Sequence, residues 1–413
     1  MTTSGQLQRS LGVGDAVVIG AGSMIGAGVF AAWAPAAQAA GTGLLIGLVI
    51  AGVVAFCNAT SSAQLAAVHP ESGGTYVYGR RQLGLGWGHM AGWGFVVGKT
   101  ASWVAMALTV GAYLWPAQQR LVAVLAVVGI VAVNIGGLTR TVAVTRVLLT
   151  VALVALSAVV VAGWTGPGVS ADQLTPITGS VDGVLQAAGF LFFAFAGYAR
   201  IATLGEEVRD PAFTIPRAIP RALAAVLVLY AIVAVTALAA VGPGELAGSE
   251  APLRAVAGSD RDGFDLVIRV GAGIASLGVL LNLIPGVSRT TLAMARNGEL
   301  PRWFAHVDPI RSLPLRAELT VAAVVVVLVS LLTIRSSIAV SGVAVLTYYA
   351  ITNASALTLD PSRRRWPRGL AVLGLVGCVT LILSLPMTAV ASGLVVLALG
   401  VAVRQGQLRL TPG

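Results

Sequence analysis

The chain has 413 residues, of which 57% are hydrophobic and only 10% are charged, and its formal net charge is +10. Soluble domains carry about a quarter charged residues, so this composition excludes an ordinary soluble protein and indicates a polytopic membrane protein. Most of the arginines fall in loops on one side of the predicted spans, as the positive-inside rule describes. The positive charge therefore indicates topology, and we expect no nucleic-acid partner.

Apolar runs of about 20 residues predict about twelve membrane helices. The runs cover residues 14–38, 42–66, 86–114, 121–137, 143–164, 182–204, 217–241, 263–295, 316–334, 338–359, 367–384 and 386–403. They lack strict alternation and are too long for lipid-facing strands, so the predicted fold class is all-α.

No hydrophilic stretch is long enough to form a separate domain, so residues 1–413 are expected to form one integral membrane domain. Placing both termini in the cytoplasm puts most arginines on the inner side of the cell (plasma) membrane. The first run, residues 14–38, is longer than the apolar core of a signal peptide, and we expect it to stay in the protein.

The first run is interrupted by a glycine-rich stretch from Gly20 to Gly28. Its four glycines each lower helix propensity by up to ~1 kcal/mol, which favours local unwinding over close helix packing alone. Irregular backbone at membrane depth is tolerated only where it faces protein or a water-filled cavity. Such a break usually marks a ligand site in a transporter.

The sixth run has a second stretch of small residues between Phe192 and Arg200. Transporters built from inverted repeats place a broken helix at corresponding positions of two halves, here the first member of each five-helix set. This position predicts a first repeat at residues 14–164, a second at 182–359, and two additional helices at 367–403.

Unwound membrane helices offer amide N–H groups to a carboxylate and freed carbonyls to an ammonium, and an amino acid carries both groups. The amides of Ser23 to Gly28 are expected to bind the carboxylate, and the carbonyls of Ala194 to Gly197 the amino group. The predicted substrate-binding residues are Ala21, Gly22, Ser23, Met24, Ile25, Gly26, Ala27, Gly28, Phe193, Ala194, Phe195, Ala196 and Gly197.

The stretch from Gly22 to Phe30 resembles the first-helix signature of amino acid–polyamine–organocation permeases. Further stretches resemble this family in the same order along the chain, namely residues 70–76, 192–198, 206–219 and 288–301. The resemblance implies a twelve-helix fold of the leucine-transporter type, with a five-plus-five inverted repeat. It also implies alternating access for amino acids or related amines.

Lys99 is the only lysine of the chain and lies near the middle of the third run. A charged lysine there costs about 2.5 to 3.5 kcal/mol on insertion scales, so a functional role is expected. Proton-coupled members of the family carry a lysine in the fifth helix, whereas residues 149–153 of this chain are apolar except for Thr150. We expect Lys99 to replace that lysine in proton coupling; the alternatives are a structural ion pair and a snorkelling cation.

Three further residues are predicted to take part in coupling or gating. Arg200 is expected to form a gate or structural pair with Glu206, and the alternative is that it binds a substrate carboxylate. Glu206 itself is either an inner gate or part of a solvated helix end. Asn282, with Ser276 and Ser288, could face the first helix in a sodium-coupled version, although such residues are more often helix-packing contacts.

An enzyme is not expected, because the predicted spans hold no cluster of histidine, acidic or nucleophilic groups. The three histidines lie in or beside loops, so a histidine proton relay, a metal site and a cofactor have no support. The spans also lack acidic residues at mid-depth, which argues against a polyamine and for a neutral or small amino acid, moved with protons. The alternatives are an amino acid exchanger and an amine or polyamine permease of the same fold.

Overall fold

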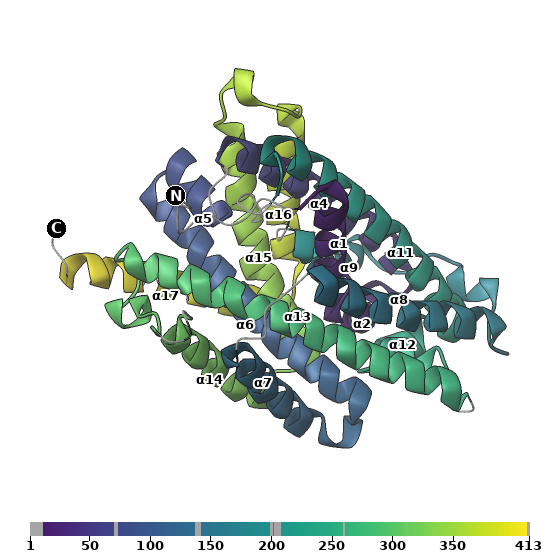
Figure 1. Ribbon diagram of the computed structural model, residues 1–413. Helices are drawn as coiled ribbons and strands as arrows, with labels where there is room; N and C mark the ends of the chain where they lie inside the picture. Colours follow the sequence, from purple (N-terminus) through teal and green to yellow (C-terminus); the bar gives the residue numbers. More distant parts are fainter. Residues whose placement is uncertain are drawn as a thin grey trace.

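The computed structural model describes residues 11–69, 73–136, 142–198, 201, 208–258, 261–309, 311 and 313–410. These residues are almost all helical, and the one β-bridge among them joins Leu11 to Val208. Figure 1 shows the helices packed side by side in a bundle. The helices are α1 (Val13–Met24), α2 (Ala27–Ala31), α3 (Trp33–Ala40), α4 (Leu44–Val68), α5 (Thr75–Gln82), α6 (Leu85–Leu114), α7 (Gln119–Ile135), α8 (Val142–Thr165), α9 (Val181–Phe195), α11 (Pro211–Gly248), α12 (Pro252–Ala255), α13 (Asp262–Arg296), α14 (Leu315–Leu331), α15 (Ile334–Leu357), α16 (Arg368–Ser384) and α17 (Met387–Leu410).

The predicted fold class, an all-α polytopic membrane protein, is confirmed. Within the described ranges, ten helical segments are long and apolar enough to cross a membrane. Two shorter helices, α14 and α16, have 17 residues each and lie where the sequence predicts the ninth and eleventh spans. The bilayer acts as the solvent here, so the exposed leucines and valines of the outer helices are compatible with the fold.

The seventh span is the one whose boundaries differ most from the prediction. Helix α11 begins at Pro211, six residues before the predicted start, because the Asp210 side chain accepts a hydrogen bond from the Phe213 amide and caps the helix. Proline at the first helical position loses no hydrogen bond, so Pro211 fits this start. At the other end Gly242 leaves the helical region at φ 73°, and a further helical turn follows up to Gly248.

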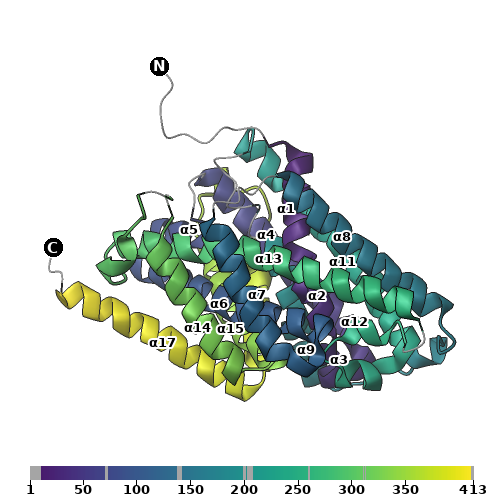
Figure 2. The same ribbon diagram turned by 60° about the horizontal axis from the view of Figure 1, so that its bottom comes forward.

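Helix α6 lies in the interior of the bundle, packed against both α13 and α15. Figure 1 shows α13 running across α6, while α17 lies at the periphery. Figure 2 shows α7 and α14 side by side next to α6. This arrangement surrounds α6 with helices along most of its length, and most of its residues are buried.

Candidate functional site

The first membrane helix is broken where the glycine-rich sequence predicts it. Helix α1 ends at Met24 and α2 starts at Ala27, while Ile25 and Gly26 between them have non-helical backbone angles. A Cβ atom on Gly26 would lie only 2.0 Å from Cγ2 of Val279, so the break packs directly against α13. Only glycine allows this approach, which explains its position in the sequence.

The sixth membrane helix is also interrupted. Helix α9 ends at Phe195, and a 3₁₀ turn continues over Ala196–Tyr198. A Cβ atom on Gly197 would lie 2.1 Å from the Ser23 carbonyl oxygen, so the backbones of the two breaks touch. The two segments predicted to bind substrate, 21–28 and 193–197, are therefore brought together although their nearest ends are 165 positions apart in the sequence.

Tyr230 of α11 joins the two breaks through one hydroxyl group. The hydroxyl donates to the Met24 carbonyl at 2.7 Å and lies 3.1 Å from the Ala194 carbonyl, and the side chain is fully buried. Tyr349 of α15 adds a second contact, because its hydroxyl donates to the Ala196 carbonyl at 3.3 Å. Carbonyls that lost their helical partners at the breaks are thus held by tyrosine hydroxyls.

The side chains at the first break are not oriented as polar ligands. The Ser23 hydroxyl donates to the Ile19 carbonyl of its own helix at 2.8 Å. Met24 and Ile25 are buried and apolar. Any polar recognition at this break must therefore come from the backbone, as the sequence predicts.

Lys99 lies in the middle of α6 and is partly exposed. Among the described residues it has no hydrogen-bond or ion-pair partner. Close contacts set the antiparallel register of α6 against α13 and place Lys99 level with the turn around Pro285. They pair Gly92 with Met294, Phe95 with Gly286, and Leu114 with Gly273. Val279, which contacts the first break, is six residues from Pro285 along α13, a distance of about 9 Å. Lys99 therefore lies about 9 Å from the level of the break, toward the C-terminal end of α13.

The remaining predicted coupling residues have mixed outcomes. The Asn282 amide donates to the Gly278 carbonyl, and the Ser288 hydroxyl to the Ile284 carbonyl, so both bond within α13. The buried Ser276 hydroxyl makes no hydrogen bond within the described part of the chain. Arg200 and Glu206 lie outside the described residues.

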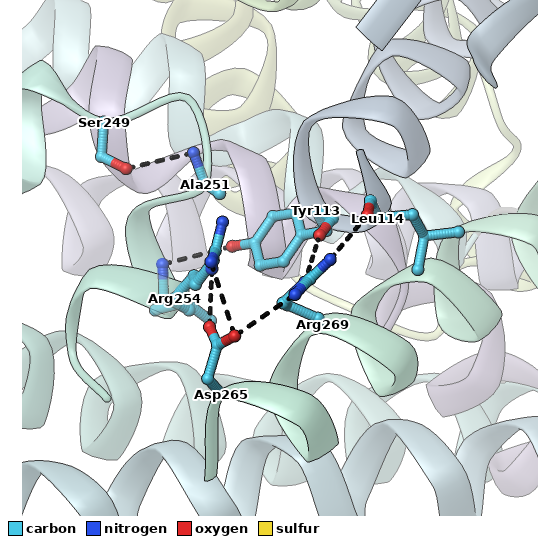
Figure 3. Close-up of polar contacts among 8 residues, drawn as sticks. Tyr113, Leu114, Ser249, Ala251, Arg254, Asp265 and Arg269 are labelled. Atoms are coloured by element: carbon cyan, nitrogen blue, oxygen red, sulfur yellow. Dashed lines mark hydrogen bonds and ion pairs between the residues drawn. The ribbon is translucent and has the colours of Figure 1, made fainter. Parts of the chain in front are cut away.

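At one end of the bundle the short helix α12 is held by Tyr113 of α6. The Tyr113 hydroxyl donates to the Phe30 carbonyl of α2 at 2.8 Å and accepts the Leu253 amide at 3.2 Å. All three residues are fully buried. This single hydroxyl therefore connects the half-helix after the first break to the loop helix α12. Figure 3 shows the Tyr113 ring beside Arg254 of this loop helix.

Charged side chains extend the same contact, as Figure 3 shows. Asp265 accepts from Arg254 at 2.6 Å and lies 3.5 Å from Arg269. Arg269 also donates to the carbonyls of Tyr113 at 3.1 Å and Leu114 at 2.8 Å. The carboxylate thus links α12 to the start of α13 and, through Arg269, to the last turn of α6.

At the opposite end, α1 is tied to its neighbours by a different set of bonds. Asp15 in the first turn of α1 pairs with Arg146 of α8 at 2.7 Å. The Arg209 amide donates to the Leu11 carbonyl at 2.9 Å, just before α11 begins. Both ends of the broken-helix region therefore carry polar contacts between helices.

The profile of the family described as amino acid permease matches residues 11–403. The chain belongs to the amino acid permease family. This confirms the resemblance to the amino acid–polyamine–organocation superfamily and makes the protein a multi-pass membrane transporter.

Several relatives of this permease are themselves named as transporters. An uncharacterized transporter of Mycobacterium tuberculosis is 58% identical over 96% of this chain and 91% of its own length. A branched-chain amino acid permease of Bacillus subtilis is 26% identical over 97% of this chain and 94% of its own. A methylthioribose transporter of the same species is 28% identical over 76% of this chain and 73% of its own.

Sequence reasoning about this permease missed the residues that hold the breaks and the ends in place. Tyr230 and Tyr113 are not singled out by the sequence, because a tyrosine in an apolar run gives no signal of its hydroxyl partner. The pair of Asp15 and Arg146 also has no local signature, since its members are 131 positions apart. Only Asp265 and Arg269, spaced four residues apart on one helix, could have been found as a pair.

Proposed function

We propose that this permease moves a neutral amino acid into the cell by alternating access, together with protons, and binds it between the two broken helices. The observation that carries the proposal is the backbone contact of the two breaks around the Tyr230 hydroxyl. The proposal includes the two five-helix repeats, 14–164 and 182–359, with 367–403 as two additional helices.

The half-helix after the first break supplies the carboxylate site. Ala32 keeps helical backbone angles between α2 and α3, so a nearly continuous half-helix runs from Ala27 to Ala40 and carries a partial positive charge at its start. The Ile25 and Gly26 amides already donate to the Ala21 and Met24 carbonyls. The donors for a substrate carboxylate therefore begin after Gly26, in the first turn of this half-helix.

The carbonyl ends of the other half-helices supply the ammonium site. Helix α1 ends at Met24 and α9 ends at Phe195, and their last carbonyls carry partial negative charge. Acidic residues of the described membrane helices lie near helix ends, at Asp15, Asp182, Asp262, Asp265, Glu245 and Glu318. A cationic side chain would find no carboxylate at mid-depth, which supports a neutral substrate, as does the similarity to the branched-chain permease.

Lys99 is proposed as the proton carrier. No anion among the described residues pairs with its ammonium, which argues against a structural ion pair. Lysine, unlike arginine, can release its proton when it is desolvated. A change between an exposed and an enclosed environment during transport would thus couple proton binding to the conformational cycle.

The two sets of end contacts act as gates in this proposal. The positive-inside rule places the start of α1 in the cytoplasm, so the pair of Asp15 and Arg146 belongs to the inner side. The contacts of Tyr113 and Asp265 then close the outer side over α2. Opening either side requires only its own set of bonds to break, which is the requirement for alternating access.

A second candidate substrate follows from the methylthioribose transporter of B. subtilis. Methylthioribose has neither a carboxylate nor an ammonium, so it would not use the partial charges of the half-helices. An amino acid exchanger would use them but would need internal substrate instead of a proton gradient. Competition experiments separate these possibilities.

Uptake into proteoliposomes tests the proposal. Labelled neutral amino acids are supplied with and without an inside-alkaline pH gradient, and accumulation above equilibrium only with the gradient is expected. Uptake that ignores the gradient but needs internal amino acid would identify an exchanger. No amino acid uptake, together with uptake of methylthioribose, would overturn the amino acid proposal.

A further inference from the structure

A buried histidine at the other end of α6 has no part in the proposed transport site. His89 lies 14 residues before Trp103 in the early turns of α6, and only 1% of it is exposed. Its ring Nε2 lies 2.8 Å from the Gly400 carbonyl of α17. A carbonyl can only accept, so Nε2 carries the hydrogen and the neutral ring has its lone pair on Nδ1.

The second ring nitrogen of His89 faces a carboxylate. Nδ1 is fully buried, has no hydrogen-bond partner among the residues that the structure describes, and lies 3.6 Å from Oε2 of Glu299. Glu299, just after the end of α13, is itself only 4% exposed. In the neutral state, therefore, a lone pair faces a buried carboxylate oxygen, which stabilises neither group.

Other polar groups already hold Glu299 in place. Its Oε1 accepts from Arg80 of α5, and its Oε2 accepts from the Tyr76 hydroxyl at 2.9 Å. The Asn297 amide donates to the same Tyr76 hydroxyl at 2.9 Å. Burial and the neighbouring Glu299 carboxylate raise the pKa of the Tyr76 phenol, so it stays a donor. The carboxylate is thus fixed in position opposite the histidine.

We propose that His89 and Glu299 form a proton-binding site at this end of the permease, distinct from Lys99. A proton added to Nδ1 becomes the donor that the buried pair lacks, and the contact becomes a charge-assisted hydrogen bond to Oε2. Histidine is the side chain whose charge ordinarily changes between pH 5 and 8. The site therefore responds to the pH on its own side of the membrane.

Some charges near the His89 ring favour proton binding and others disfavour it. The Glu299 carboxylate favours the added proton. The positive charge of Arg80 on α5 disfavours the added proton. Arg404 on α17 also disfavours it, because the Arg404 guanidinium lies near Gly86, one turn before His89. Asn297 and the protonated Tyr76 are neutral. The carboxylate lies 3.6 Å from Nδ1, close enough to accept a hydrogen bond from a proton placed there after a small shift.

Proton binding would tighten a contact between elements that are far apart in the sequence. His89 holds α17 through Gly400, and Glu299 holds α5 and follows the last turn of α13. The same α13 carries Val279, which packs on the first break. Acidification on this side would therefore restrain the helix against which the substrate site is built, and would slow its rearrangement.

Nuclear magnetic resonance of the histidine rings tests the site without any transport assay. The chain has three histidines, so protein with ¹³C-labelled rings gives three signals, assigned with His69→Gln, His89→Gln and His306→Gln. We expect the His89 signal to shift as the sample is acidified. At a given pH, Glu299→Gln should lower the protonated fraction of His89, and Arg80→Gln should raise it. The proton-binding constant of His89 should change about tenfold for each 1.4 kcal/mol of interaction that the substitution removes.

The two substitutions keep the test decisive even if one variant does not fold. A His89 signal that does not move with pH, or that moves identically in the folded variant and the wild type, would overturn the proposal. The readout does not depend on substrate, so a failed transport proposal leaves it unchanged.

A flux measurement then tests the consequence. Substrate exchange is measured at equal pH on both sides, so no gradient drives it. Acid should slow exchange in the wild type and in the exposed-site control His306→Gln, but less in His89→Gln, whose amide can still donate to Gly400. Equal slowing in all three proteins would contradict the proposal that proton binding at His89 restrains α13.

Discussion

Removing the Tyr230 hydroxyl is the most direct test of how the two breaks are held together. Tyr230→Phe keeps the ring and its packing but removes the donor that the Met24 and Ala194 carbonyls share. The Met24 carbonyl still accepts from the Gly26 amide, so the larger loss falls on the Ala194 carbonyl. Hydrogen bonds between membrane helices contribute about 0.6 kcal/mol on average and up to about 1.7 kcal/mol. A buried acceptor left without a partner costs about 1–3 kcal/mol.

We therefore expect Tyr230→Phe to lose about 1–2 kcal/mol, because one hydroxyl proton is shared between two carbonyls and the full cost applies to only one of them. This corresponds to about 5- to 30-fold weaker substrate binding if the loss falls on the geometry of the site. Equilibrium binding of the labelled amino acid to purified protein measures the affinity, and thermal inactivation of the same samples measures stability.

Tyr78→Phe is the matched control. Tyr78 is also buried, at 1% exposure, but its hydroxyl has no hydrogen-bond partner within the described part of the chain. Deleting an unsatisfied hydroxyl should leave stability and affinity unchanged or slightly higher. If Tyr230→Phe binds substrate as tightly as Tyr78→Phe and is equally stable, the hydroxyl does not hold the breaks and the reasoning fails.

Three further predictions follow from the same geometry. Gly197→Ala should abolish transport, because the added Cβ would overlap the Ser23 carbonyl. The control Gly129→Ala should transport normally, because its Cβ would have no atom within 4 Å, and uptake by the two variants tests this. Lys99→Met should lose accumulation driven by a pH gradient while keeping exchange, and gradient-driven uptake equal to wild type would contradict its role as proton carrier. Tyr113→Phe removes the donor to Phe30 and the acceptor for the Leu253 amide. Maleimide labelling of Leu253→Cys should therefore become faster in that background, and an unchanged rate would argue against the outer gate.

The positions of the helix breaks were predictable from the sequence because their cause is local. Glycines between Gly20 and Gly28 weaken the helix, and the observed break at Ile25 and Gly26 lies inside that stretch. The same holds for the sixth span, where α9 ends at Phe195 within the predicted stretch. Local propensity decides where a membrane helix fails, so a single sequence contains the information.

The partners that hold those breaks were not predictable, because they depend on packing between distant segments. Tyr230 reaches a carbonyl 206 positions away, and Tyr113 reaches one 83 positions away. Backbone carbonyls are present at every residue, so they leave no trace in the composition. The histidine at position 89 illustrates the same limit, since its burial depends on α17, at the far end of the chain.

Helix α6 has 30 residues without a proline, and it carries His89 near one end, Lys99 between, and Tyr113 at the other end. About 36 Å separate His89 from Tyr113 along its axis. When a helix of this length tilts as one unit by about 10° about its middle, each end moves by about 3 Å, which is more than a hydrogen bond tolerates. A tilt of α6 that breaks the Tyr113 bonds at one end would therefore also displace the histidine at the other.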